Sequence, residues 1–228
     1  MEVVVHALDI AGCDAGEVDA LADLLNDDER ARAARFAFEA DRRAYVAAHA
    51  LLRFRLSRLI DGAPQDWRFA TTAQGKPNLV EAPRDLRFSL THARDRVAVA
   101  ICEGIDIGVD VEPGNRRAES LKLAERFFAQ EEAAFLRALE GEARREAFFA
   151  IWTLKEAVVK ATGQGLAGGL DGFVISLEPL GITLRDPAPP ADWRLAHWRL
   201  GAHHVALAGR CAEWSPRLVE VDAASLRA

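Results

Sequence analysis

The chain has 228 residues, half of them hydrophobic, and carries a net charge of −6 with a pI near 5.6. This composition excludes a disordered chain and argues against nucleic-acid binding. The three cysteines lie far apart without metal-site spacing, which favours the reducing cytoplasm over an oxidising compartment. The sequence shows neither a signal peptide nor an apolar run long enough to cross a membrane.

The first hundred residues predict strands around one long helical region. In chain order we expect a strand at 3–8, a helix at 17–25, a long helical region at 28–60, a strand at 67–71, a turn at 74–77 and a hairpin formed by 86–90 and 96–101. The helical region contains no Gly or Pro and is rich in arginine. Most of these arginines are expected on a solvated helix face.

The remainder of the chain repeats this plan. We expect a strand at 105–112, one or two helices in 121–139, a helix at 144–162, a strand at 173–177, a loop at 186–190 and a hairpin formed by 193–200 and 203–208. The second hairpin weakly resembles the first. The sequence therefore predicts an α+β fold of two similar halves, residues 1–104 and 105–228, with a ligand cleft between them.

Two charged residues of the predicted helix 144–162 lie on an unusually apolar surface. One side of the helix is an apolar stripe, and the opposite side carries Glu156 and Lys160 together with Phe149, Trp152 and Val159. The pair is either an exposed i, i+4 ion pair, worth a few tenths of a kcal/mol, or part of a functional site. The glycine-rich run that follows the helix favours the functional interpretation, because it lets backbone approach a ligand closely.

Asp110 and Glu112 alternate with valines on the predicted strand 105–112, so both carboxylates point to one face. Two adjacent anions raise each other's pKa unless a cation lies between them. Oxygen ligands without His or Cys suit Mg²⁺. The alternative is an edge strand with a solvated acidic face.

Together these two motifs resemble the signatures of the 4′-phosphopantetheinyl transferases, in particular the larger, surfactin-synthetase-activating (Sfp-type) branch. The matching residues are Gly108, Asp110 and Glu112, followed by Trp152, Lys155, Glu156, Ala157, Lys160, Gly163, Gly165 and Leu166. The turn at 74–77 resembles the family's G-K-P turn, and residues 88–92 resemble its F-N-x-S-H segment. Here Ser89 replaces Asn and Thr91 replaces Ser. The shorter Ser89 is expected to lose a backbone hydrogen bond, at a net cost of about 1 kcal/mol.

The resemblance implies a pseudo-twofold pair of α+β halves, each a small antiparallel sheet packed on helices, that binds coenzyme A in the cleft. Such enzymes move the 4′-phosphopantetheine arm of coenzyme A to a serine of an apo carrier protein and release adenosine 3′,5′-bisphosphate. Asp110, Glu112 and Glu156 would hold Mg²⁺, with Mn²⁺ as a substitute. Glu156, or a water on the metal, would take the serine proton.

The resemblance also assigns the substrate-binding residues. Lys160 would contact the phosphates, and Thr91 and His92 would bind the phosphates of the nucleotide, so that Glu156, Lys160 and His92 form the catalytic set. Lys76 and an arginine among Arg32, Arg35 and Arg43 would meet the 3′-phosphate or adenine end, although Glu29 stands where some members carry lysine. Trp152 is expected to pack in the core and shape the site, and Lys155 is expected either to be structural or to lie near the outer shell of the metal.

The implied partner is an acyl or peptidyl carrier protein of fatty acid or secondary-metabolite biosynthesis. Candidate docking residues are Lys122, Arg126, Phe127, Phe128 and those around Leu166. Members of this branch are usually monomers, which implies a monomer here. Two other hypotheses stay open: a non-catalytic coenzyme A or carrier-binding module of the same fold, and an Mg²⁺-dependent phosphohydrolase of unrelated fold.

Overall fold

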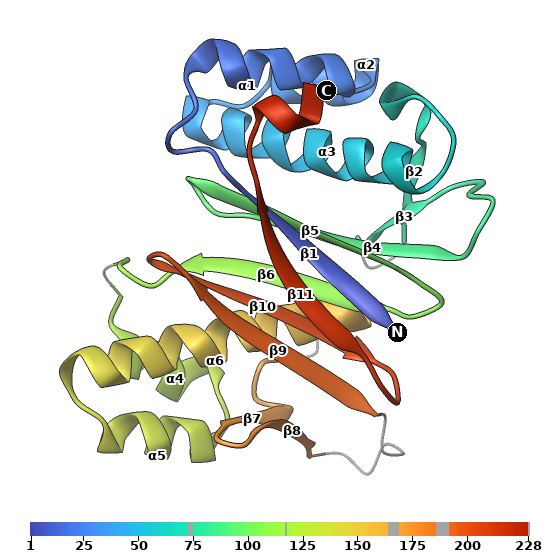
Figure 1. The fold of residues 1–228 in the computed structure, drawn as a ribbon. Coiled ribbons are helices and arrows are strands. Elements are labelled where there is room, and N and C mark those ends of the chain that lie inside the picture. Colours follow the sequence, from blue (N-terminus) through green and yellow to red (C-terminus); the bar gives the residue numbers. More distant parts are fainter. Residues whose placement is uncertain (73–74, 117, 164–168, 186–191, 228) are drawn as a thin grey trace.

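A computed structural model describes residues 1–72, 75–116, 118–163, 169–185 and 192–227. Two sheets lie face to face, and each is covered on its outer side by helices (Figure 1). The predicted α+β fold of two similar halves is confirmed. The turn predicted at 74–77 lies partly, and the loop at 186–190 entirely, outside the described residues.

The first sheet has the strand order β11-β1-β5-β4, and the long helix α3 packs on it. The strands are β1 (Glu2–Asp9), β4 (Leu86–His92), β5 (Arg96–Glu103) and β11 (Ser215–Val221). The outer layer consists of α1 (Ala15–Leu21), η1 (Ala22–Leu24), α2 (Asp27–Ala33), α3 (Glu39–Leu59) and η2 (Pro64–Asp66). A small two-stranded sheet, β2 (Phe69–Thr71) with β3 (Pro77–Leu79), connects η2 to β4.

The second sheet has the order β6-β10-β9, and the long helix α6 packs on β6 and β10. Its strands are β6 (Ile107–Pro113), β9 (Trp193–Leu200) and β10 (His203–Arg210). The helices are α4 (Ser120–Phe127), α5 (Gln130–Ala138) and α6 (Gly141–Thr162), followed by the hairpin β7 (Phe173–Leu177) and β8 (Leu180–Leu184) and, at the end of the chain, by η4 (Ala224–Arg227).

Alternate residues of both sheets form the core between them. Val3 and Val5 of β1 face Val109 of β6 and Val205 and Leu207 of β10, and all five side chains are almost fully buried. Successive residues of a strand point to opposite faces, so the other face of each sheet packs on its helices. Each sheet is therefore apolar on both faces, and polar residues concentrate at its edges and ends.

The last strand crosses from the second half to the first. β11 pairs in parallel with β1, so the first sheet is mixed and not purely antiparallel as expected. Buried Arg96 of β5 donates to Asp9 at 2.7 Å and to Glu220 at 3.1 Å, tying β11 to the sheet. The division into 1–104 and 105–228 stays a prediction, and the first sheet takes one strand from beyond it.

The long helical region expected at 28–60 is two helices. Residues 34–38 separate α2 from α3, although no Gly or Pro lies there, and Phe38 is extended at the start of α3. The ring of Phe36 packs against Tyr45 of α3 with 5.2 Å between centroids. Tertiary packing thus ends α2 where local propensity would have continued it, which is the usual limit of propensity arguments. No helix among the described residues is both long and apolar enough to cross a bilayer.

A buried ion pair joins α6 to α5. Lys155 Nζ lies 2.8 Å from Glu132, with both side chains at most 1% exposed. Lys155 also donates to the carbonyls of Leu170 and Phe173, and Glu132 accepts from the backbone N–H groups of Ala129 and Ile175. The expected structural role of Lys155 agrees with these contacts, since its ammonium is enclosed by acceptors.

Replacing Lys155 by Ala should leave the Glu132 carboxylate buried without a cation, and should lower the free energy of unfolding by about 3–5 kcal/mol. Urea unfolding followed by circular dichroism measures this change. Lys122→Ala, which breaks an exposed pair with Glu119, is the control and should cost less than about 1 kcal/mol. A loss for Lys155→Ala no larger than that of the control would contradict the structural role.

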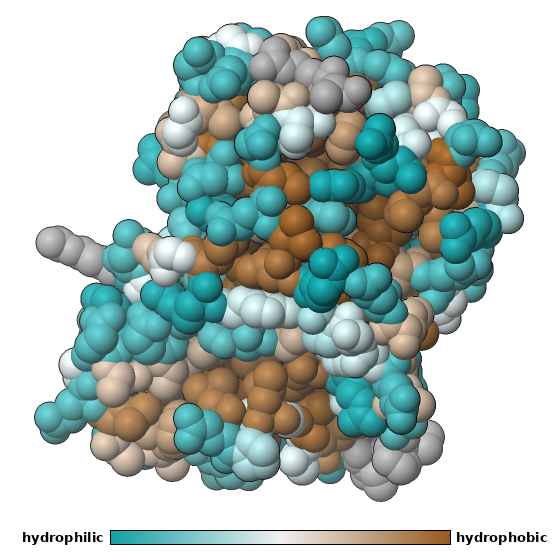
Figure 2. Space-filling view, viewed as in Figure 1, coloured by the Kyte–Doolittle hydropathy of each residue, from teal (hydrophilic) through white to brown (hydrophobic). Residues whose placement is uncertain are grey.

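A cavity of about 710 Å³ opens between α6, β7, β8 and β9, where Figure 2 shows apolar side chains gathered on the lower part of the molecule. Its inner wall includes His197 and His204, whose Nε2 and Nδ1 atoms lie 3.0 Å apart. Burial and Arg199 lower the pKa of His197 to about 4 and that of His204 to about 3. Both rings are therefore neutral in the folded protein at pH 7.

Acid should destabilise the fold through these two rings. Below their ordinary pKa of 6.5 the unfolded chain takes up protons that the folded chain does not, so stability is complete above pH 6.5 and falls as the pH falls. The loss from pH 7 to 5 should be roughly 2 kcal/mol per ring. Urea unfolding at both pH values should show a smaller loss in His204→Asn than in the unsubstituted protein. An equal loss would contradict the assignment.

Candidate active site

The helix α6 lies unusually close to β6, and Gly108 makes this approach possible. A Cβ atom at Gly108 would lie 2.0 Å from the carbonyl oxygen of Ala157 and 2.5 Å from the amide nitrogen of Ala161. Real Cβ atoms do not come so near to backbone. The contact brings the last turns of α6 over the strand, and with them Glu156 and Lys160 over Asp110.

Asp110, Thr91 and Lys160 meet at this point, from β6, β4 and α6. Lys160 Nζ lies 2.6 Å from Asp110 Oδ1 and 2.8 Å from Thr91 Oγ1, and Thr91 Oγ1 donates to the same carboxylate oxygen at 3.0 Å. Asp110 is only 4% exposed. Its second oxygen, Oδ2, is buried and has no hydrogen-bond partner among the described residues.

Glu112 and Glu156 share the electrostatic field of Asp110. Burial and the neighbouring Asp110 raise the pKa of Glu112 to about 7, and the same two causes raise the pKa of Glu156. Arg116 lies 3.8 Å from Glu112, and Glu156 has no ion pair within 4.0 Å among the described residues. When all three carboxylates are ionised, they outnumber the two cations, Lys160 and Arg116.

This arrangement fits a hard divalent cation in its chemistry. The donors are carboxylate oxygens only, one of them is buried and unpartnered, and their mutual repulsion favours a positive ion between them. Within the described residues, no three His, Cys, Asp or Glu side chains already lie close enough to hold a metal ion. Lys160 instead supplies the positive charge next to Asp110.

A cavity of about 280 Å³ opens in front of these residues, between the two halves. Glu156, Lys160 and Gly163 of the second half form one wall, and Lys76 and Phe88 are among the residues of the opposite wall. A neighbouring cavity of about 240 Å³ shares Pro77, Phe88 and Leu90 with it and extends to Arg32 of α2. Together the two cavities extend from Glu156 and Lys160 of α6 to Arg32 of α2.

Two residues of the first half fix the end of α6 and β6. Lys76 Nζ donates to the carbonyl of Ala161 at 3.0 Å and lies 3.2 Å from Asp106. Ser89 Oγ accepts a 3.0 Å hydrogen bond from the backbone N–H of Val109. The expected loss of a backbone hydrogen bond at Ser89 is therefore wrong, because β4 and β6 are close enough for the shorter side chain to reach.

The other residues predicted to bind the substrate lie in different parts of the structure. His92 is exposed at the end of β4, beside another cavity, of about 410 Å³, that Phe38 and Arg94 also line. The surrounding protein and Lys160 lower the pKa of His92. Arg32 lies over the ring of Tyr45, and Arg35 is exposed.

Arg43 lies apart from these residues. It donates to the carbonyls of Ile10 and Cys13 and lines neither of the two connected cavities. Its guanidinium ties α3 to the loop that follows β1. The structure therefore does not bring Arg43 to the cleft.

Comparisons with known proteins agree with this geometry. The model of the 4′-phosphopantetheinyl transferase superfamily matches residues 106–208, and the model of the N-terminal part of 4′-phosphopantetheinyl transferase matches residues 14–103. A putative 4′-phosphopantetheinyl transferase from Synechocystis sp. is 37% identical over 78% of this chain and 72% of its own length. The chain belongs to the 4′-phosphopantetheinyl transferase superfamily.

Two further relatives support membership. The 4′-phosphopantetheinyl transferase HetI from Nostoc sp. is 36% identical over 74% of this chain and 72% of its own length. The 4′-phosphopantetheinyl transferase Sfp from Bacillus subtilis is 30% identical over 73% of this chain and 74% of its own length. These similarities confirm the predicted family and favour a catalytic transferase over a non-catalytic module of the same fold.

Sequence reasoning missed two features around the site of this transferase. One is the pair of Glu132 with Lys155, and the other is the buried triad of Glu29, His49 and Arg53. In both, the residues that contact each other lie far apart in the sequence. The only available signal was a capping-box pattern, Asn26 to Glu29, at the start of α2. Such a pattern predicts a helix start and not a long-range ion pair.

Gly108→Ala should displace α6 from β6, because the new methyl group would overlap the backbone of Ala157. We expect a loss of unfolding free energy of roughly 1–3 kcal/mol and loss of transferase activity. Differential scanning calorimetry and a transfer assay measure the two effects. Gly12→Ala, whose added Cβ meets no atom within 4 Å, is the control and should change neither. Full activity in Gly108→Ala would contradict the need for this close contact.

Proposed function

We propose that this transferase takes the 4′-phosphopantetheine arm from coenzyme A, attaches it to a serine of an apo acyl or peptidyl carrier protein, and releases adenosine 3′,5′-bisphosphate. The observation that carries this proposal is that Glu156 and Lys160 line a cavity between the halves, while Lys160 binds Asp110 and the charge of Asp110 acts on both Glu112 and Glu156. A pyrophosphate with its counter-ion would complete the charges of this site. We propose further that the halves 1–104 and 105–228 each supply one wall of the donor site.

Mg²⁺, or Mn²⁺ in its place, is the cation that the carboxylates would hold. The unpartnered Oδ2 of Asp110 is the first expected ligand, and Glu112 and Glu156 are the others. When bound, the ion would neutralise the pyrophosphate and polarise the phosphorus under attack. Lys160 would then turn from Asp110 toward the phosphate oxygens, since its side chain is 31% exposed at the cavity.

The transfer exchanges one phosphorus–oxygen bond for another. The serine oxygen of the carrier bonds to the phosphorus that carries pantetheine, and the bond from that phosphorus to the bridging oxygen breaks. The nucleotide leaves with that oxygen. Glu156 takes the serine proton, directly or through a water.

The cleft provides the groups expected to hold the donor. Lys160 and Lys76 line the reaction cavity, Thr91 adjoins it, and His92 lies at the end of the same strand. Arg32 lines the neighbouring cavity and is our candidate for the far end of the nucleotide, with the exposed Arg35 beside it. Arg43 is the weakest of the predicted ligands, because carbonyls occupy its guanidinium.

Carrier docking is proposed on α4. Arg126 lies over the ring of Phe127, which is 36% exposed and contacts Trp152 of α6 edge to face. Phe128 is buried and stacks on Phe148, so it belongs to the core. Lys122 and Arg126 would attract an acidic partner, and Leu166 lies outside the described residues.

We propose that the enzyme acts as a cytoplasmic monomer.

Glu156→Gln should abolish transfer while the fold is retained, because the amide can neither take the serine proton nor hold the cation as a carboxylate does. We expect kcat/KM to fall by about a hundredfold or more. The measurement is the mass of an apo carrier protein after incubation with coenzyme A and Mg²⁺. Glu142→Gln, at an exposed position of the same helix, is the matched control and should transfer normally.

Two results would contradict the proposal. Normal transfer by Glu156→Gln would remove this residue from the mechanism. Absence of any mass gain across a panel of carriers with the unsubstituted enzyme would refute the proposed reaction. Release of phosphopantetheine to water without a carrier would instead indicate hydrolysis.

A further inference from the structure

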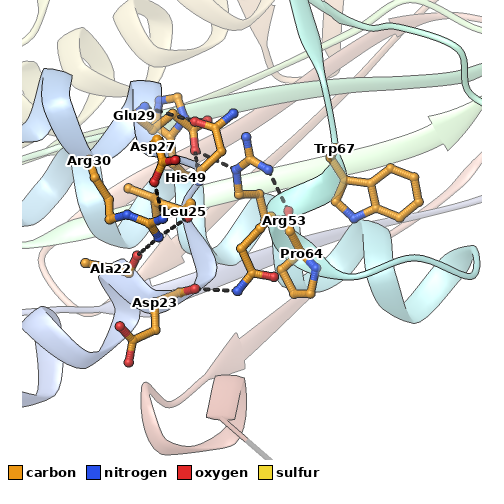
Figure 3. A network of polar contacts seen from close by, with 12 residues as sticks. Ala22, Asp23, Leu25, Asp27, Glu29, Arg30, His49, Arg53, Pro64 and Trp67 are labelled. Carbon is orange, nitrogen blue, oxygen red and sulfur yellow. Dashed lines mark hydrogen bonds and ion pairs between the residues drawn. The ribbon is translucent and has the colours of Figure 1, made fainter.

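A buried polar triad anchors the short helix α2 on α3 (Figure 3). Glu29 of α2 is 8% exposed, and its Oε1 accepts from His49 Nδ1 at 2.9 Å while Oε2 accepts from Arg53 Nε at 2.5 Å. Arg53 is fully buried and donates onward to the carbonyl of Pro64. Burial opposes ionisation of Glu29, but hydrogen bonds from His49 and Arg53 outweigh it and hold its pKa below the ordinary value.

The helix that carries Glu29 cannot be stable by itself. It has seven residues, which is far below the length at which an isolated helix forms in water. Some of its contacts are local: Glu29 closes a capping box with Asn26, and Arg30 binds Asp27 and the carbonyl of Leu25. Ala33 packs in the core of the first half, and the two bonds from Glu29 are the buried polar contacts that hold α2 on α3.

Glu29 and His49 of the triad line the cavity of about 240 Å³ that continues the reaction cavity. Arg32 follows Glu29 by three residues, so both side chains lie on one face of α2. Glu29 points inward to α3, and Arg32 lies over the ring of Tyr45 and lines the cavity together with His49. Both carboxylate oxygens of Glu29 are already bound, and its negative charge would repel a phosphate.

We propose that Glu29 is a positioning residue for the donor substrate: through His49 and Arg53 it fixes α2 and thereby holds Arg32 at the nucleotide end of the cleft. This inference rests on the proposed function, which places the nucleotide of coenzyme A in this cavity. It assigns Glu29 no contact with substrate. It also explains why Glu29 lies beside a cavity proposed to bind an anionic nucleotide: its negative charge holds His49 and Arg53.

Glu29→Gln keeps the size of the side chain and one acceptor oxygen, and removes the charge that holds Arg53. We expect the Kd for coenzyme A and for adenosine 3′,5′-bisphosphate, measured by calorimetry, to rise by about tenfold. The kcat at saturating coenzyme A should stay within about twofold, since chemistry occurs at the other end of the cleft. Asp27→Asn, at a 96% exposed position on the same helix, is the control and should bind normally.

A double-mutant cycle separates positioning from general destabilisation. If Glu29 acts through Arg32, Glu29→Gln should add less than about twofold to the Kd of an enzyme that already carries Arg32→Gln. A full additional tenfold loss, an unchanged Kd in Glu29→Gln, or a fall in kcat with unchanged Kd would each overturn the inference. If Glu29→Gln does not fold, His49→Gln takes its place in the cycle, because it removes one of the two bonds that hold Glu29. It should raise the Kd for coenzyme A, but not in an enzyme that already carries Arg32→Gln.

These outcomes are distinct from failure of the proposed function. An unsubstituted enzyme that binds neither coenzyme A nor adenosine 3′,5′-bisphosphate would refute the proposed donor. An unsubstituted enzyme that binds both, with Glu29→Gln equal to it, would refute only the role of Glu29.

Discussion

The close contact between α6 and β6 is the constraint on which the site depends. Gly108 lets the backbone of Ala157 and Ala161 rest against the strand. The next residue of β6 whose side chain faces α6 is Asp110. A helix held further away would leave Lys160 unable to reach Asp110 at 2.6 Å. The signature glycine is therefore required by packing, and the chemistry of the aspartate two residues later follows from it.

The second determinant is an imbalance of charge that the protein leaves unresolved. Lys160 compensates Asp110, but Glu112 and Glu156 lie in the same field, and burial raises their pKa values. Repulsion between such carboxylates lowers the stability of the folded protein, and a cation bound between them offsets this loss. The arrangement is consistent with an enzyme whose donor arrives as a polyanion together with a cation.

The sequence predicted which residues of the candidate site lie near one another better than it predicted the architecture around them. Asp110, Glu112, Glu156 and Lys160 could be identified because strand and helix periodicities place each on a defined face and because their spacing matches a family signature. The break between α2 and α3 could not, since it depends on Phe36 meeting Tyr45 and no breaker residue marks it. β11 was missed because it is an edge strand that contains Pro216, and because its partner β1 is at the opposite end of the chain.

A buried ion pair joins the long helix to a short helix in both halves, but the surroundings of the two pairs differ. In each half the long helix carries a fully buried cation, Arg53 on α3 and Lys155 on α6, that binds a glutamate on a short neighbouring helix. Each glutamate also accepts the backbone N–H at the start of its own helix.

The environments of the two pairs nevertheless differ. The Lys155–Glu132 pair is surrounded by backbone and aromatic rings, whereas the Arg53–Glu29 pair continues through His49, which is 20% exposed, to a cavity. An ion pair that served stability alone would gain nothing from this opening, because exposure to water weakens it. The ion pair of the first half thus lies beside the cavity that Arg32 lines, which is the position required by the positioning role proposed for Glu29.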